Sequence, residues 1–366
     1  MSDLNAKLEI YVLGGKLGES IIIRTPSGAF GVIDSYASSL TDPTTNPTLK
    51  RLEELGAKRL RFIALSHPHV DHFKGLFTLF QRYKGNIEQF WRFPFGQANW
   101  SVLFQQFIEE YNLEETIKGR LTIAQKIKDL KRILELANAE KKTGMMPVTT
   151  QDEKIMLDEE GLSIICLGPS TEIVDVYQEA LAKQVIVRQS HTAEADHNLI
   201  SSVLAVKYGD WVGILGGDTE QRCWHDILER CGNKWIEGAS FVKVSHHGSP
   251  TGSFDGLWQN FKSSSCEVVV TCYEKQGLPK ATGVQCIFER GFSLHSTNAT
   301  VAIQLCNETK TPPTYSTKPS VTHEPLESQH GGEVRITVDE AGQATVDYFG
   351  AAGPLYVAQA KSNEPV

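Results

Sequence analysis

Three histidines and one aspartate lie within six positions of the segment "ALSHPHVDHFKGL", residues 64–76: His67, His69, Asp71 and His72. Neutral imidazoles and carboxylates are the usual ligands of zinc and related divalent cations. His67 and His69 are separated by one residue, so in an extended backbone they project to the same side. Asp71 and His72 follow after a turn and can serve a neighbouring position. The segment therefore predicts a metal site with room for two adjacent cations.

A set of hydrogen-bonded surface histidines is the alternative interpretation, and two further segments weigh against it. In "ILGGDTE", Asp218 follows an apolar stretch and two glycines that leave room for a close approach. In "KVSHHGSP", His246 and His247 follow another apolar stretch, so five of the eleven histidines lie in two strand-end loops. Asp218 lies between these loops in the chain, which favours one shared metal site.

The elements that must position these residues are predicted from apolar alternation and turn residues. A helix over residues 46–56, closed by Gly56, precedes a buried strand that ends at Ser66. The histidines therefore follow the carboxyl end of a strand, where α/β folds usually bind ligands. Further strands or hairpins are expected within residues 7–14, 19–35, 153–168, 201–218, 240–245, 266–274, 291–296 and 332–349, with a short helix in 219–233.

Residues 76–145 differ from the rest of the chain and are expected to form a helical insertion. They are dense in aromatic residues and then carry apolar residues at helical spacing. The polar face of that helix carries Lys118, Arg120, Lys126, Lys128, Lys131 and Arg132. A solvated helix face is the simpler interpretation, and a local anion-binding patch is the alternative. Residues 307–332, rich in proline and threonine, are expected to form an exposed loop within a single domain spanning residues 1–366.

Composition narrows the class of protein. The chain has 366 residues, 40% of them hydrophobic and 22% charged, with a formal net charge of −8. This is typical of a globular protein and does not suggest a general polyanion binder. No apolar run is long enough to span a membrane, and no basic segment followed by an apolar stretch marks a signal peptide. The seven cysteines are scattered without a CxxC pair, so we expect reduced thiols and a cytoplasmic location.

The order of the motifs resembles the metallo-β-lactamase superfamily. Asp34 in "VIDS" comes first, the HxHxDH motif of residues 67–72 follows a strand, and Asp218 and a late histidine pair come after it. The similarity is greatest to the ComEC-like branch, the hydrolase domain of bacterial competence proteins and their stand-alone relatives. It covers most of residues 8–75 and 155–305, but not the expected insertion. The resemblance implies an α/β fold, the metallo-β-lactamase αβ/βα sandwich.

The resemblance also implies roles for single residues. The implied metal ligands are His67, His69 and His246 for the first cation, Asp71 and His72 for the second, and Asp218 as a bridge between them. His247 would contact the non-bridging or leaving oxygens and form the catalytic set with Asp71 and Asp218. His197, 21 residues before Asp218, is a further candidate ligand. Where the branch usually carries Gly-His-Pro this chain has Leu278, so one tightly held and one weakly held cation are expected.

A site of this kind lowers the pKa of bound water to about 7 and so supplies hydroxide. We expect one or two divalent cations, zinc first, with manganese or iron as alternatives. The resemblance suggests a phosphodiesterase or nuclease. A hydrolase of a small ester, lactone or phosphodiester remains open, and so does a metal-bearing module acting with partner proteins in a bacterial defence assembly. The expected partners are a phosphodiester or nucleic-acid substrate and a protein bound through residues 76–145, with no membrane.

Overall fold

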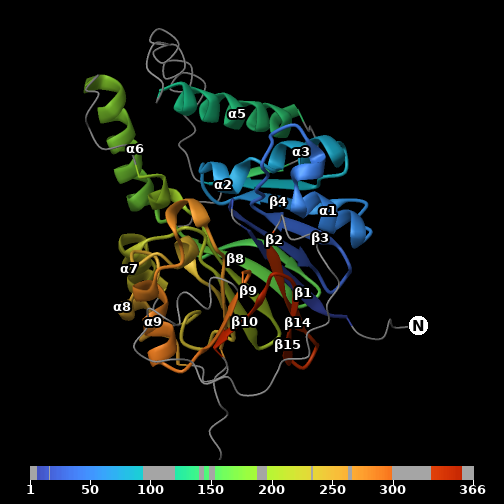
Figure 1. Ribbon diagram of the computed structural model, residues 1–366, viewed down its shortest axis with the longest axis vertical. Helices are drawn as coiled ribbons and strands as arrows, with labels where there is room; N and C mark the ends of the chain where they lie inside the picture. Colours follow the sequence, from blue (N-terminus) through green and yellow to red (C-terminus); the bar gives the residue numbers. More distant parts are fainter. Residues whose placement is uncertain are drawn as a thin grey trace, which may run out of the picture.

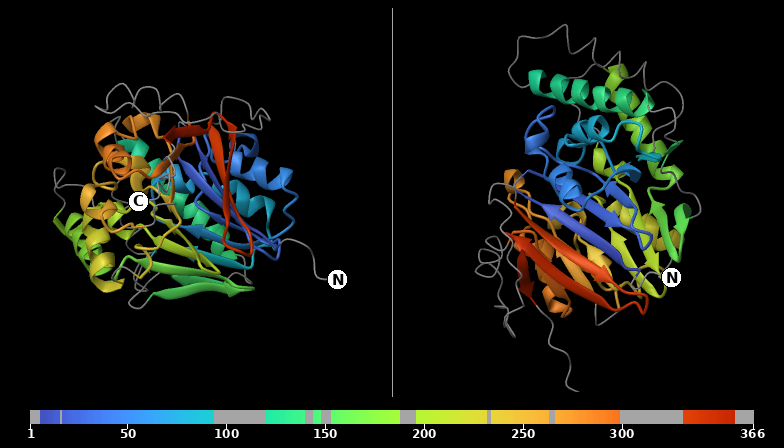
Figure 2. Two further views of the ribbon diagram at one scale, coloured as in Figure 1. Left: turned by 90° about the horizontal axis from the view of Figure 1, so that it is seen from below. Right: turned by 90° about the vertical axis from the view of Figure 1, so that its right-hand side faces the viewer.

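The computed structural model describes residues 6–15, 17–93, 120–139, 144–147, 153–187, 196–231, 234–262, 266–298 and 331–356. Two eight-stranded sheets lie between two layers of helices in this part of the chain (Figure 1). Figure 2 shows the sheets facing each other, with helices on both outer sides. None of the described helices is long and apolar enough to cross a membrane.

The first sheet is built mostly from the amino-terminal part of the chain, with the carboxyl-terminal hairpin added beside β1. Its strands, in spatial order, are β15 (Ala344–Gly350), β14 (Gly332–Val338), β1 (Leu8–Gly14), β2 (Glu19–Arg24), β3 (Phe30–Ile33), β4 (Leu60–Leu65), β5 (Gln89–Arg92) and β6 (Gly144–Pro147). The expected final hairpin is confirmed, and it pairs antiparallel with β1. From β3 to β6 the strands are parallel, so their carboxyl ends meet at one edge.

The second sheet comes from the carboxyl-terminal part of the chain. Its strands, in spatial order, are β16 (Gly353–Tyr356), β13 (Ser293–Ser296), β12 (Glu267–Val270), β11 (Phe241–Lys243), β10 (Trp211–Leu215), β9 (Val203–Tyr208), β8 (Leu162–Gly168) and β7 (Lys154–Glu159). Strands β10 to β13 are parallel and β9 is antiparallel to β10. The start of β9 therefore lies at the same edge as the ends of β10, β11 and β12.

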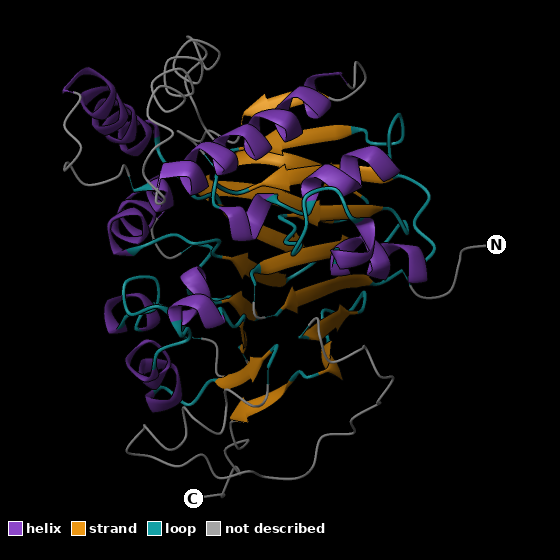
Figure 3. Ribbon diagram, turned by 45° about the horizontal axis from the view of Figure 1, so that its top comes forward, coloured by secondary structure: helices purple, strands orange, loops and turns teal. Residues whose placement is uncertain are grey.

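Helices cover the outer face of each sheet (Figure 3). The described helices are α1 (Pro47–Glu54), α2 (Val70–Phe73), α3 (Leu76–Arg82), α5 (Arg120–Ala139), α6 (Thr171–Val187), α7 (Gln221–Cys231), α8 (Asp255–Trp258) and α9 (Ala281–Glu289). Local sequence explains α1: Asn46 caps it by accepting a hydrogen bond from the backbone of Leu49, and Pro47 occupies its first turn. Gly56, with a φ of +72°, ends it as expected.

Three apolar layers hold the four layers of elements together. Alternation along the strands assigns each side chain to a layer: Ile21 and Ile23 of β2 pack between the sheets, whereas Ile22 packs under the helices. In β8, Ile164 likewise lies between the sheets and Ile165 lies under α7, α8 and α9. Burial of both faces of each sheet confirms the expected α/β class and its αβ/βα sandwich architecture.

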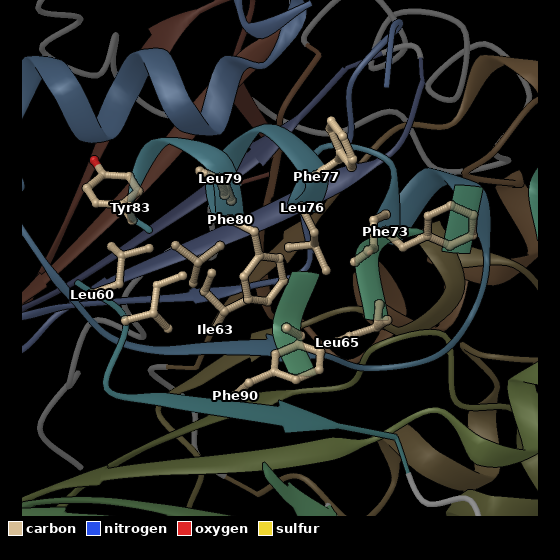
Figure 4. Close-up of a cluster of buried hydrophobic side chains, with 14 of the residues drawn as sticks. Leu60, Ile63, Leu65, Phe73, Leu76, Phe77, Leu79, Phe80, Tyr83 and Phe90 are labelled. Atoms are coloured by element: carbon tan, nitrogen blue, oxygen red, sulfur yellow. The ribbon is translucent and has the colours of Figure 1, made fainter. Parts of the chain in front are cut away.

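The region expected as a helical insertion differs from that expectation over its first part. Helix α3 packs on β4, where Phe80 meets Phe90 of β5 edge to face with ring centroids 5.2 Å apart (Figure 4). Strand β5 pairs in parallel with β4. Its aromatic residues form a strand buried on both faces, a pattern that periodicity alone does not separate from a buried helix. Helix α5 also joins this core through Ile133. Residues 94–119 and 307–330 lie outside the described residues.

Candidate metal centre

The predicted metal ligands converge at the edge where strands of both sheets end. His67, His69 and Asp218 form one group of potential ligands, and the ligand atoms of this group lie within 4.8 Å of one another. Asp71, His72, Asp218 and His247 form a second group within the same limit. Asp218 belongs to both groups. One short loop after β4, one residue after β10 and one after β11 therefore supply the potential ligands of two adjacent cation positions.

Asp218 lies between the two groups. Its Oδ2 atom is 3.6 Å from Nε2 of His67 and 3.3 Å from Nε2 of His72. Its backbone N–H donates to the hydroxyl of Ser201 over 2.8 Å, which holds the turn after β10. His247 places its Nε2 atom 3.4 Å from Oδ2 of Asp71 and 3.9 Å from Oδ1 of Asp218. These spacings suit a carboxylate that is shared between two cations.

Several ligand atoms of the described residues have no hydrogen-bond partner although they are buried. They are Nε2 of His72, Oδ1 of Asp218 and Nε2 of His247. A buried polar atom without a partner is costly, so this arrangement needs a further group to satisfy it. Imidazole nitrogens and carboxylate oxygens converging on one spot fit a divalent cation.

Asp34 supports the histidines from behind. It accepts a hydrogen bond from Nδ1 of His72 over 2.8 Å, and from the backbone and hydroxyl of Ser66 over 2.8 and 2.5 Å. The Ser66 hydroxyl also lies 3.0 Å from Nδ1 of His67. Because that hydroxyl donates to Asp34, it accepts from His67, which leaves Nε2 of His67 as the lone-pair nitrogen. Asp34 thus orients two histidines toward the centre, as outer carboxylates do in metal sites.

The pKa values at the site favour neutral His67 and His69 in the first group and a positively charged His72 in the second. Burial, reinforced by neighbouring imidazoles, holds the pKa of His67 well below its usual value and lowers that of His69 to about 4. Burial opposes the charged form of His72, but Asp218 and Asp34 outweigh it and hold its pKa well above the usual value. Burial likewise opposes ionisation of Asp218, but His72 and His247 outweigh it and hold that pKa well below its usual range. The carboxylates therefore attract positive charge to the second group.

The two consecutive histidines of the loop after β11 point to different places. His247 joins the second group, whereas Nδ1 of His246 lies 2.9 Å from Oε1 of Glu220 and His246 is in neither group of the described residues. Both residues have positive φ, 46° and 50°, which is strained for a non-glycine residue. This backbone path separates the two rings, with centroids 6.5 Å apart, and reverses the placement that the resemblance implies for them.

Leu278 stands where the resemblance implies a histidine ligand for the second cation. Leu278 is buried, and its backbone pairs with that of Tyr273 through two hydrogen bonds of 3.0 Å. His247 is a fourth potential donor in the second group, and the weakly held second cation stays a prediction. Tyr273 stacks on His247 with ring centroids 5.2 Å apart, and burial together with the charges of Asp71 and Asp218 raises its pKa to about 12.

His197 lies beside the first group. It opens a short 3-10 helix, His197–Ile200, just before β9, and its ring is 5.4 Å from that of His69 at an angle of 72°. Its Nδ1 atom is 2.8 Å from the hydroxyl of Tyr177 in α6. The signal in the sequence is its spacing from Asp218, and the antiparallel pairing of β9 with β10 brings the two residues to the same edge.

A cavity of about 620 Å³ opens onto the centre. His69, Asp71, Asp218, His197, His246 and His247 line it, together with Tyr273 and three lysines, Lys74, Lys126 and Lys275. Of the basic face expected on the helix now seen as α5, Lys126 reaches the cavity and Lys128 is exposed away from it. Arg132 packs over the ring of Phe77 at 4.8 Å, and Lys118 lies outside the described residues.

Comparisons with known proteins found similar solved structures. No protein-family model and no curated protein matches the sequence. The structure is similar to a diphosphatase of the PhnP family, at 11% identity over 76% of this chain and 90% of that chain, with a TM-score of 0.38. The metallo-β-lactamase fold protein YhfI from Bacillus subtilis is 11% identical over 73% of this chain and 86% of its own, with a TM-score of 0.37.

A third similar structure is Zn²⁺-bound PqqB from Methylobacterium extorquens. It is 11% identical over 78% of this chain and 97% of its own, with a TM-score of 0.39. At such low identity these likenesses concern the arrangement of helices and strands, and the ComEC-like branch stays a prediction. The residues of this chain build two adjacent groups of potential metal ligands around one shared aspartate.

Proposed function

We propose that this chain is a metal-dependent hydrolase that cleaves phosphodiester bonds. The observation that carries the proposal is the position of Asp218, shared by two groups of buried ligand atoms at the floor of a lysine-lined cavity. Divalent cations bound there would supply Lewis acidity and an activated water for attack on a phosphoryl or carbonyl centre. The protein contributes the ligands, their orientation by Asp34, and a partly enclosed cavity.

Three lysines favour an anionic substrate over a neutral ester or lactone. Lys74 follows α2, Lys126 lies in α5 and Lys275 lies in the loop after β12, so separate elements bring positive charge to one cavity. The chain as a whole has a net charge of −8, and Asp71, Asp196 and Asp218 also line the cavity, so bound cations would be needed beside the lysines to make it positive. The cavity volume of about 620 Å³ lies in the range of small-ligand sites and favours a small phosphodiester or the end of a single strand.

The neighbours of each histidine suggest which cation it would hold or which other role it would have. His67, His69 and His197 would hold the first cation, and Asp71, His72 and His247 the second, with Asp218 between them. His246 lines the cavity while its Nδ1 atom faces the carboxylate of Glu220. Glu220 is itself held by the hydroxyl of Thr251 over 2.9 Å. A histidine oriented in this way suits proton donation to the leaving oxygen.

A substrate panel tests the proposal. The purified chain, loaded with zinc or manganese, would be given bis(p-nitrophenyl) phosphate, p-nitrophenyl phosphate, p-nitrophenyl acetate, single-stranded DNA, duplex DNA and RNA. We expect turnover of the diester and of single-stranded ends, and its loss in the double variant His67→Ala/His69→Ala together with loss of metal. Turnover of the acetate ester alone would contradict the phosphodiester assignment while leaving the metal centre in place.

A further inference from the structure

We infer that Thr271 and Glu19, supported by the buried Lys243, are positioning residues that fix the tautomer and direction of His247. The inference rests on the proposed function, because it concerns how one ligand of the second group is held for a cation. Glu19 and Thr271 lie outside the motifs that predict the ligands, and Lys243 opens the segment "KVSHHGSP" without being a candidate ligand. Thr271 and Glu19 are 252 positions apart in the chain; Thr271 follows a strand of the second sheet and Glu19 opens a strand of the first.

The contacts form a chain behind the imidazole of His247. Its Nδ1 atom lies 2.9 Å from the hydroxyl of Thr271, and that hydroxyl donates to Oε2 of Glu19 over 2.6 Å. The same carboxylate oxygen is 3.4 Å from Nδ1 of His247 and forms an ion pair with Lys243. All four side chains are buried, with at most 1% of each residue exposed.

The direction of these hydrogen bonds decides the tautomer. A threonine hydroxyl has one proton, so a hydroxyl that donates to Glu19 can only accept from His247. His247 must therefore carry its proton on Nδ1, which leaves the lone pair on Nε2. That Nε2 atom has no hydrogen-bond partner and lies 3.4 Å from Oδ2 of Asp71. The tautomer set from behind is the one that a cation in the second group requires.

The ion pair with Lys243 explains how the carboxylate of Glu19 can be buried behind His247. A buried carboxylate is costly unless it is paired and hydrogen-bonded. The Lys243 ammonium supplies the opposite charge, and the hydroxyl of Thr271 supplies the hydrogen bond. Lys243 ends β11, Thr271 follows β12 and Glu19 opens β2, so the network joins the two sheets at the metal edge. Residues from both halves of the sandwich therefore hold His247 in position.

A second hydroxyl–carboxylate pair stands behind a histidine of the first group. This repetition indicates that the arrangement behind His247 is not accidental. Behind His67, the hydroxyl of Ser66 donates to Asp34 and lies 3.0 Å from Nδ1 of His67. Behind His247, the hydroxyl of Thr271 donates to Glu19. In both cases a hydroxyl–carboxylate pair directs Nε2 of a histidine toward Asp218. Outer partners of this kind typically change metal affinity by about 10- to 100-fold when removed.

The variant Thr271→Val tests the network, because valine keeps the shape of threonine and removes the acceptor. Thr271→Ser, which keeps the hydroxyl, is the matched control. The metal-stripped proteins would be titrated with zinc by calorimetry. We expect Thr271→Val to weaken the site built on His247 by about 10- to 100-fold, and Thr271→Ser to remain within about threefold of the wild type. Equal affinities in all three proteins would overturn the inference.

A second measurement does not depend on whether Thr271→Val folds. Nitrogen-15 NMR of the histidine rings in the metal-free protein, with His247 assigned through a His247→Gln variant, reports the tautomer directly. We expect the proton on Nδ1 of His247 in the wild type and in Thr271→Ser. A proton on Nε2 in the wild type would overturn the inference even if Thr271→Val does not fold. Full metal binding without phosphodiester turnover would instead refute the proposed function and leave this network standing.

Discussion

The Nδ1 atom of His246 lies 2.9 Å from Oε1 of Glu220, and His246 is in neither group of potential metal ligands among the described residues. His247, one residue later, faces Asp71 and Asp218. We therefore expect His247→Ala to lose the second cation, with affinity reduced by at least about 100-fold. His246→Ala should keep both cations. Elemental analysis after dialysis measures the difference, and equal metal loss in the two variants would contradict this assignment.

His246→Ala should instead slow turnover in a way that depends on the leaving group. A lost proton donor typically costs about 10²- to 10⁴-fold. The loss should be large for a diester with a poor leaving group, such as an alkoxide, and small for p-nitrophenolate, which leaves without protonation. Steady-state rates on a series of diesters measure the slope. The same loss for every leaving group would remove His246 from this role.

His197→Ala should weaken the first cation, since the His197 ring lies 5.4 Å from that of His69 and lines the same cavity. Three donors would then be left for that position, His67, His69 and the shared Asp218. We expect one of two cations to be retained after dialysis. His225→Ala, a change in α7 where the ring contacts Phe254, is the control that should retain both. Two tightly held cations in His197→Ala would exclude His197 as a ligand.

Lys126 and Lys128 lie two residues apart in α5, and only Lys126 lines the cavity. Lys126→Glu should raise KM for an anionic diester by about twofold to thirtyfold, because an exposed charge pair is worth roughly 0.2–1 kcal/mol and charge reversal changes twice that. The effect should shrink as salt screens the charge. Lys128→Glu should leave KM nearly unchanged. If both variants raise KM equally, the effect comes from the overall charge of the protein and not from the position of Lys126 in the cavity wall.

Glu333 makes the stability of the fold depend on pH. Burial raises its pKa to about 7, although Arg51, whose Nη2 lies 2.9 Å from Oε1, acts in the opposite direction. The folded protein therefore holds a proton that the unfolded chain releases near pH 4.5. The stability from this group is complete below that pH and is lost as the pH rises to about 7, a change on the order of 3 kcal/mol.

Glu333→Gln should flatten this part of the stability profile, because glutamine does not titrate. Urea unfolding at pH 5, 6, 7 and 8 gives the free energy of unfolding of both proteins. The difference between the wild type and Glu333→Gln should shift in favour of the variant as the pH rises. A difference that stays constant over this range would show that Glu333 is ionised throughout.

The local sequence determined much of the candidate site. The apolar strand before His67, the one-residue spacing of His67 and His69, and the turn that carries Asp71 and His72 are set by neighbouring residues along the chain. Alternation within β2 and β8 likewise determined which side chains face the other sheet and which face the helices. These features follow from backbone geometry over a few residues, so they are readable without a structure.

Tertiary structure decided the features that depend on distant segments. Periodicity did not show that the aromatic residues of β5 form a strand of the core, because a short apolar run buried on all sides suits a helix equally well. The roles of His246 and His247 depend on two consecutive positive φ angles and on Glu220, which lies 26 positions before His246. The pairing of Thr271 with Glu19 exists only because two sheets pack face to face and bring the end of β12 to the start of β2. The sequence by itself therefore determined which residues could bind a metal, and packing between the sheets decided which nitrogen of which histidine faces the shared Asp218.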